Sequence, residues 1–119
     1  MVPRPDARRK ERAGERKVVK TPTWHVYVVG TRDGALYTGV TTDVARRIAE
    51  HSAGGRGARY LRGREPLEIV YRRRLGERGL ALRVEWHLKR RPRADKLEIV
   101  ASRLSRRALL RRLGVNEPR

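Results

Sequence analysis

The sequence contains no cysteine, few acidic residues and no long apolar segment. Without cysteine the chain can form neither a disulfide nor a thiolate metal site, and it has no thiol nucleophile. No apolar run approaches the roughly 20 residues that a membrane-spanning helix needs. The basic N-terminal segment is not followed by the apolar core of a signal peptide. We therefore expect a soluble cytoplasmic protein whose main partner is not a membrane.

The shortage of acidic residues leaves a large positive charge. Thirteen Asp and Glu residues face 31 Lys and Arg residues, which gives a formal net charge of +18. The many positive side chains repel one another in the folded state, and a polyanionic partner would compensate this repulsion. Nucleic acid is the partner that the composition favours, with DNA first. A ribosomal contact or an anionic membrane surface is the alternative.

The length of 119 residues suits a single domain. Residues 1–22 are poor in apolar residues and rich in charge, so we expect a disordered basic tail. This tail is either an electrostatic arm or a merely solvated segment. We expect the folded domain at 23–114, with its core at 23–97 and a C-terminal helix to residue 113. A disordered end should follow at 115–119.

Local patterns predict an α+β fold. Alternating β-branched and aromatic residues indicate strands at "TWHVYVVG", "ALYTGV" and "LEIVYRRR", the last with Leu67, Ile69 and Tyr71 on one face. Helical periodicity indicates helices at 43–51, 77–90 and 94–113, the first capped by Thr41 or Thr42. The order β-β-α-β-α-α predicts a small three-stranded mixed sheet flanked by helices.

The loop between the first two strands decides where two tyrosines lie. A two-residue turn at Asp33-Gly34 would put Tyr27 and Tyr37 on opposite faces of the sheet. A three-residue loop with Gly34 in the left-handed region would pair Tyr27 with Gly39 and bring both tyrosines to one face. We predict the three-residue loop. Gly39 should then leave open space beside Tyr27, where water or phosphate could lie.

The first predicted helix separates two adjacent arginines. Val44 and Ile48 mark the core side of the helix, and Arg47 and His51 lie four residues apart on its flank. Arg47 should be held against the domain, whereas Arg46 faces water and makes at most a loose phosphate contact. A histidine at a helix end is most often an ordinary polar surface residue, and this alternative stays open for His51.

The second predicted helix carries an acidic residue in basic surroundings. Its core stripe is Leu80, Ala81, Val84 and Leu88. Glu85 lies on the flank of this stripe, near Lys89 and Arg90. It either forms ordinary ion pairs or serves as an oxygen ligand for a divalent metal. Leu82 and Trp86 face the other way, so the third helix or a partner should cover them.

The third predicted helix should pack through one apolar stripe. Its members are Leu97, Val100, Ala101, Leu104 and Ala108. Basic residues lie away from the centre of this stripe. The candidate nucleic-acid contacts of the whole chain are Arg46, Arg59, Arg62, Lys89 and Arg90. No element resembles a recognition helix that reads bases, so recognition of shape and backbone is expected.

Several of these residues together resemble the GIY-YIG nuclease superfamily. They are Tyr27 in "HVYVV", Tyr37-Thr38-Gly39, Asp43, Arg47, His51, and Glu85 in "GLALRVEWHLK". The resemblance covers roughly residues 23–97 and is greatest to the small stand-alone bacterial members. It implies a GIY-YIG-type endonuclease that hydrolyses phosphodiester bonds in DNA with one Mg²⁺ or Mn²⁺ ion. We expect cleavage to be directed by DNA structure or backbone rather than by base sequence. A role in DNA repair or recombination would suit such an enzyme.

The resemblance also implies roles for these positions. Either Tyr27 or Tyr37 would help to deprotonate the attacking water, and Gly39 is the motif glycine. Arg47 would stabilise charge on the phosphoryl group, and His51 would assist or orient. In the same comparison Glu85 would hold the metal ion.

The sequence departs from the family pattern at four places, and one of them is Pro92, which opens the third predicted helix where relatives tend to offer a Ser or Thr cap. His25 replaces the first motif glycine, and Val40 stands where some members carry a lysine. Asn116 lies too close to the chain end to match the C-terminal asparagine of some family nucleases. A weakly catalytic or non-catalytic binding module of the same fold is therefore the main alternative, and an RNA- or ribosome-associated protein is a further one. We expect a monomer or weak dimer with room for a protein partner.

Overall fold

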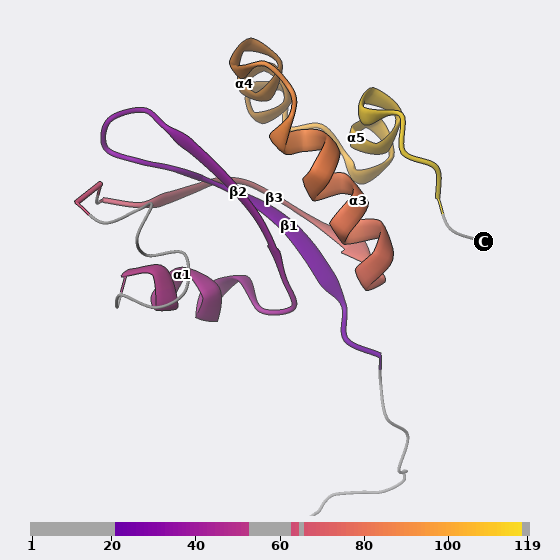
Figure 1. Cartoon of the computed structure of the whole chain (residues 1–119), viewed down its shortest axis with the longest axis horizontal. Coiled ribbons are helices and arrows are strands. Elements are labelled where there is room, and N and C mark those ends of the chain that lie inside the picture. Colours follow the sequence, from indigo (N-terminus) through magenta and orange to yellow (C-terminus); the bar gives the residue numbers. More distant parts are fainter. Residues whose placement is uncertain (1–20, 53–62, 65, 118–119) are drawn as a thin grey trace, which may run out of the picture.

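The computed structural model describes residues 21–52, 63–64 and 66–117. Within these residues the chain folds as a three-stranded sheet with helices on both sides (Figure 1). In chain order the elements are β1 (Trp24–Gly30), β2 (Leu36–Thr41), α1 (Val44–Ser52), β3 (Glu68–Gly76), α3 (Arg78–Lys89), α4 (Arg93–Ser102) and α5 (Arg106–Leu113). The predictions for residues 1–20 and for Arg59 and Arg62 lie outside the described residues.

The sheet has the order β2-β1-β3, and both strand pairs are antiparallel. The α+β class and the three strands are confirmed, but the expectation of a mixed sheet is wrong. The short β1–β2 connection explains the first antiparallel pair. A tight hairpin joins β1 to β2, and β3 returns along the other edge of β1 with the opposite direction.

The two faces of the sheet bury separate apolar clusters. On the side of α1 lies a small cluster around Tyr27, Val29 and Val44. On the other side, α3 and α5 cover a larger cluster built on Val26 and Val28 (Figure 1). The predicted stripe of α3 is confirmed, because Leu80, Ala81, Val84 and Leu88 are all buried there.

Strand β3 changes face in its middle. Val28 pairs with Tyr71 and Val29 pairs with Ile69, so Val70 is an extra residue that forms a bulge. Ile69 therefore packs on the α1 side and Tyr71 in the larger cluster on the other side. The predicted placement of Leu67, Ile69 and Tyr71 on one face is wrong, because a bulge resets the alternation.

The predicted third helix is two helices. The chain breaks at Arg103, whose φ of 51° lies in the left-handed region and caps α4. Arg73 holds this break by donating to the carbonyls of Arg103 and Leu104, both at 2.8 Å. The hydroxyl of Tyr71 also donates to the Leu104 carbonyl, at 2.6 Å. These bonds satisfy carbonyls that the end of α4 leaves without helical partners.

The break changes which residues reach the core. Ile99, Leu109, Leu110 and Leu113 are buried, whereas Leu97 is 42% exposed. The stripe predicted for one continuous helix is therefore wrong for Leu97 and Ala101, which are exposed, whereas Val100 and Leu104 do pack against the core. Val115 is buried behind α5 and donates to the Leu110 carbonyl at 2.9 Å. The predicted disordered end at 115–119 is thus wrong for residues 115–117.

The start of α1 is capped by Asp43. Its carboxylate accepts from the backbone N–H of Arg46 at 3.1 Å, which is the bond of an N-cap residue. Thr41 instead accepts from the N–H of Asp43 at 3.1 Å, so the cap predicted at Thr41 or Thr42 lies one or two residues later. In the part of the chain that the structure describes, every helix is too short or too polar to cross a membrane.

Candidate active site

The loop between β1 and β2 brings the two tyrosines to one face of the sheet. The backbone N–H of Thr31 donates to the carbonyl of Ala35, and Gly34 has a φ of 85°. Three residues therefore form the loop, as predicted. Tyr27 pairs with Gly39, and Tyr37 pairs with Val29. Both rings consequently lie on the side of α1.

Tyr27 and His51 form a buried pair. The Tyr27 hydroxyl lies 3.1 Å from Nε2 of His51, and the two residues are 1% and 2% exposed. The ring of Tyr37 meets His51 edge-on, with 5.3 Å between the ring centroids. His51 is thus an interior residue between the two tyrosines, and the alternative of an ordinary surface histidine is wrong. Its spacing of four residues from Arg47 was the sequence signal for this position.

Gly39 leaves no open space beside Tyr27. A Cβ atom on Gly39 would lie 2.6 Å from Cζ of Tyr27 and closer still to its hydroxyl oxygen. The phenol ring itself fills the room that the missing side chain provides. The space predicted here for water or phosphate is therefore wrong, and Gly39 instead lets the ring lean across the edge strand β2.

Substituting Gly39 with alanine should destabilise the domain by about 1–3 kcal/mol, because the methyl group displaces the Tyr27 ring. The matched control is Gly79→Ala, where a Cβ would meet its nearest atom at an ordinary 3.6 Å. Gly79 lies inside α3, so alanine there should stabilise the fold by roughly 0.5–1 kcal/mol. Thermal denaturation of both variants measures the contrast. Equal melting temperatures for the two would contradict the close approach.

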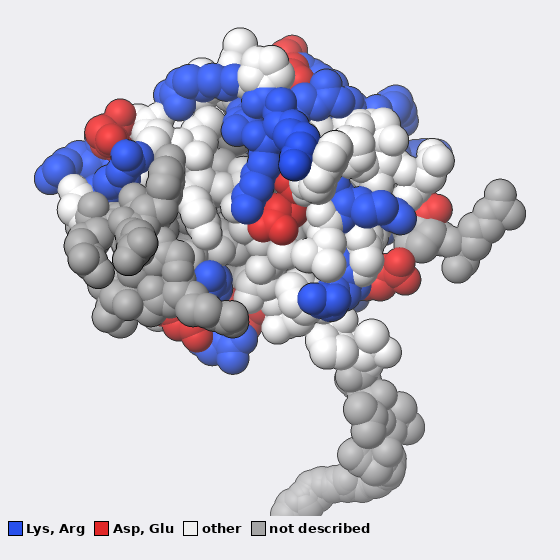
Figure 2. Space-filling view, viewed as in Figure 1, with Lys and Arg blue, Asp and Glu red and all other residues white. Residues whose placement is uncertain are grey.

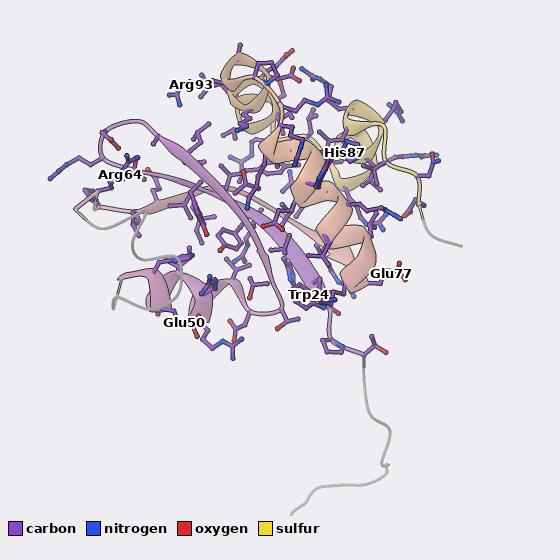
Figure 3. All side chains as sticks on the ribbon, in the orientation of Figure 1. Trp24, Glu50, Arg64, Glu77, His87 and Arg93 are labelled. Carbon is purple, nitrogen blue, oxygen red and sulfur yellow. The ribbon has the colours of Figure 1, made fainter. Side chains whose placement is uncertain are left out.

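The two adjacent arginines of α1 differ as predicted. The side chain of Arg47 is 19% exposed and donates to Glu50 at 3.1 Å, whereas that of Arg46 is 63% exposed. Both tyrosines help to raise the pKa of Arg47. Arg47 also lines a surface hollow of about 400 Å³ together with Trp24, Val40, Thr41, Thr42, Arg46 and Glu50. Figure 3 labels Trp24 and Glu50 among these residues.

The surroundings of Tyr27 keep its hydroxyl protonated. Burial, Tyr37 and Glu85 raise the pKa of Tyr27, Arg47 opposes them, and the result is a pKa of about 12. Burial also lowers the pKa of Arg47, but Glu50 and the tyrosines outweigh this and the pKa of Arg47 rises. At neutral pH the site therefore combines a neutral phenol with a permanently charged guanidinium.

The raised pKa of Tyr27 predicts a loss of stability in alkali. The ordinary pKa of the phenol is 10.0, and burial raises it to about 12 in both Tyr27 and Tyr71. The folded state holds these protons more tightly, so their contribution is intact below about pH 10 and is lost towards pH 12. Each contributes on the order of 2–3 kcal/mol.

Denaturant unfolding at several pH values between about 8 and 12 tests this. Tyr27→Phe should flatten the alkaline decline, and Tyr71→Phe should flatten it by a similar amount. A Tyr27→Phe protein that declines as steeply as the wild type would show that Tyr27 ionises equally in both states.

Glu85 approaches this group from α3. Its side chain is 22% exposed, and its charge raises the pKa of Tyr27. Nζ of Lys89 lies 3.3 Å from the Glu85 carboxylate, so the ordinary ion pair exists. The structure thus groups Tyr27, Tyr37, Arg47 and His51, and Glu85 lies near enough for its charge to act on Tyr27.

A metal site at Glu85 would have one protein carboxylate. Within the described ranges no group of three or more His, Cys, Asp or Glu side chains could hold an ion. Zinc and calcium sites need such a group. Mg²⁺ keeps several waters and is held by one or two carboxylates and the phosphates of a substrate. The donor set at Glu85 fits Mg²⁺ or Mn²⁺ in this mode.

The candidate nucleic-acid contacts are dispersed around the site. Arg46 is exposed beside Arg47, and Lys89 pairs with Glu85. Figure 2 shows Lys and Arg side chains gathered over the region where Figure 1 places α3 and α4, next to acidic side chains. Arg90 lies with its guanidinium carbon 3.7 Å from the ring centroid of Trp86. This contact is additional to the sequence predictions, although the spacing of four residues could have indicated it.

Comparison with known families decides the relationship. The family model of the GIY-YIG catalytic domain matches residues 23–98. The chain belongs to the GIY-YIG family. The resemblance predicted from the sequence is confirmed, and it places the protein in a nuclease superfamily. All five residues of the site lie within the matched range.

Relatives of this GIY-YIG domain occur in several bacteria. The UPF0213 protein YhbQ of Salmonella typhimurium is 44% identical over 87 residues, which cover 73% of this chain and 86% of the relative. A UPF0213 protein of Citrobacter koseri is 45% identical over 87 residues, with the same shares of 73% and 86%. The solution structure of the UPF0213 protein BH0048 from Bacillus halodurans is 34% identical. Its TM-score is 0.47, and the match covers 79% of this chain and 99% of that one.

Proposed function

We propose that this GIY-YIG protein is a metal-dependent endonuclease that hydrolyses phosphodiester bonds in DNA. The observation that carries the proposal is the grouping of Tyr27, Tyr37, Arg47 and His51 from β1, β2 and α1, with Glu85 of α3 near enough for its charge to act on Tyr27. The group combines a fixed cation, phenol hydroxyls and one carboxylate. These are the parts that phosphoryl transfer needs, since its catalysis consists mainly of positioning and electrostatic stabilisation.

Arg47 stabilises the negative charge that develops on the transferred phosphoryl group. Its guanidinium is charged at every relevant pH, and Glu50 holds it from one side at 3.1 Å. The flanking hollow gives a phosphate access to this side chain. Arg46 contacts the DNA backbone only loosely, in keeping with its exposure of 63%.

The two tyrosines have different roles in this proposal. Tyr27 is buried with its hydroxyl on His51 and has a pKa of about 12, so it orients the site through a fixed phenol. Tyr37 is the more exposed of the two and hydrogen-bonds the attacking water. A proton released from this water can pass to His51, whose Nε2 lies within hydrogen-bond distance of the Tyr27 hydroxyl.

Glu85 would hold the metal ion together with phosphate oxygens and water. A divalent ion there supplies Lewis-acid stabilisation of the phosphoryl oxygens and a more acidic water. Glu85 must first exchange Lys89 for the ion, and the exposed Lys89 is free to turn towards a phosphate. The single carboxylate makes ion binding depend on the substrate, so loading should follow DNA binding.

The net charge of +18 supports a polyanionic substrate, and no described element reads bases. We therefore propose recognition of DNA structure and backbone, with a role in repair or recombination. The test is incubation of the protein with labelled duplex, flap and single-stranded DNA in the presence of Mg²⁺ or Mn²⁺. Cut products from at least one substrate are expected, and intact substrates throughout would refute the proposal.

A second candidate function is DNA or RNA binding with little or no cleavage. Val40 favours it, because this position next to the motif glycine offers no cation that would lower the pKa of a tyrosine. The high pKa of Tyr27 points the same way. Binding of all three DNAs without cutting would favour this module.

A further inference from the structure

Trp86 is an exposed aromatic residue with a fixed orientation. Its side chain projects from α3 and is 52% exposed, the largest exposure among the large apolar residues that the structure describes. The Arg90 guanidinium covers one face of the indole at 3.7 Å from the ring centroid, and Arg90 also donates to the Trp86 carbonyl at 3.0 Å. The ring of His87 meets the indole edge-on, at 4.9 Å between centroids.

This arrangement leaves apolar surface that a ligand can bury. A tryptophan in water forgoes burial of a large apolar surface, and α4 and α5 leave it uncovered. Leu82, one turn earlier on the same side of α3, is 37% exposed as well. The predicted covering of these two residues by the third helix is therefore wrong.

Trp86 lies beside the candidate active site. It directly follows Glu85 in α3, so its side chain projects about 100° further around the helix, towards water. Lys89 and Arg90 flank it, and Figure 3 shows His87 on the same helix. A strand whose phosphate reaches Glu85 would pass Trp86 within a basic surrounding.

We propose that Trp86, clamped by Arg90, is a stacking platform for an unpaired nucleobase next to the scissile phosphate. The inference rests on the proposed function and specifies its substrate class. The favoured substrate is DNA with an unpaired nucleotide at the cleavage position, such as a flap, a fork or a single strand. A base within a regular duplex has both faces stacked on its neighbours, so its face is inaccessible to the indole.

Three features select a base as the occupant. The indole offers a flat apolar surface, and stacking of bases on aromatic side chains tolerates any sequence. Arg90 adds a cation to the stack. The surrounding positive charge attracts the phosphates on either side of the base, whereas a purely apolar protein partner would gain nothing from it.

Binding of Trp86→Ala to labelled DNA, measured in EDTA so that cleavage does not interfere, tests the platform. Affinity for a flap or single strand should fall roughly 5- to 150-fold, and affinity for fully paired duplex should stay unchanged. Trp86→Phe should retain most of the affinity. Leu82→Ala is the matched control on the same side of α3 and should bind like the wild type.

Fluorescence gives an independent measure. The chain has two tryptophans, so Trp24→Phe leaves Trp86 as the reporter. Its emission should be quenched by a flap but not by the same flap with an abasic site at the unpaired position. The platform would be overturned if Trp86→Ala bound every DNA with wild-type affinity, or if its affinity fell equally for paired and unpaired DNA. It would also be overturned if the only effect of Trp86→Ala were weaker self-association of the protein.

The outcomes separate this inference from the proposed function. A wild type that cuts DNA, together with a Trp86→Ala protein that binds every DNA normally, would overturn the platform and leave the nuclease intact. A wild type that binds none of the DNAs would overturn both.

Discussion

Replacing Glu85 with glutamine should lower metal-dependent cleavage at least about 10³-fold, because a metal contributes several kcal/mol of transition-state stabilisation. An amide has nearly the shape of the carboxylate but lacks the charge that holds a divalent ion. DNA affinity should be at least as high as in the wild type, because the removed charge repels phosphate. Single-turnover cleavage and equilibrium binding on the same labelled flap measure the two effects.

Glu98→Gln is the matched control for this substitution. Glu98 also lies on a helix, α4, and pairs with a basic residue, Arg112, but its side chain is 62% exposed. It should cut at the wild-type rate. Should Glu85→Gln also cut at that rate, Glu85 is a surface ion-pair partner of Lys89, and the metal site must be sought elsewhere.

Replacing Arg47 with alanine should lower the rate of cleavage about 10³- to 10⁵-fold, the range found for an arginine that neutralises transition-state charge. The affinity should change far less, since Arg47 is one cation among the 31 Lys and Arg residues. The large effect on the rate follows from the position of Arg47, because its side chain is held at the site and is only 19% exposed. Measurement of the rate and the dissociation constant over a range of salt concentrations separates the two quantities.

The neighbouring Arg46 provides a control, because it carries the same side chain on the same helix but projects it towards water. Arg46→Ala should leave the rate nearly unchanged, because its side chain points to water. If Arg46→Ala lowered the rate as much as Arg47→Ala, both arginines would act only through the overall positive charge of the protein. The assignment of Arg47 to the phosphoryl group would then be wrong.

Patterns within one short stretch of sequence were sufficient to predict the hairpin loop and the different directions of Arg46 and Arg47 in α1. Gly34 fixed the three-residue loop, because a left-handed residue there is needed for Thr31 to pair with Ala35. The period of two then placed both tyrosines on one face. In α1 the helical period separated Arg46 from Arg47 in the same way.

Features that depend on contacts distant in sequence were beyond these patterns. The bulge at Val70 follows from how β3 pairs with β1, and the break at Arg103 is held by Arg73 from a different element. The burial of His51 requires the Tyr27 ring, and the ring in turn occupies the space over Gly39. Each involves a partner more than ten residues away, which periodicity within one segment does not reveal.

The most direct test of the account is the metal dependence of cleavage by the wild-type protein. A labelled flap is first bound in EDTA, and excess Mg²⁺ or Mn²⁺ is then added under single-turnover conditions. The account predicts a stable complex without cutting in EDTA and cleavage once the metal is present. A complex that forms and stays uncut with either metal, or cutting that proceeds equally in EDTA, would contradict it.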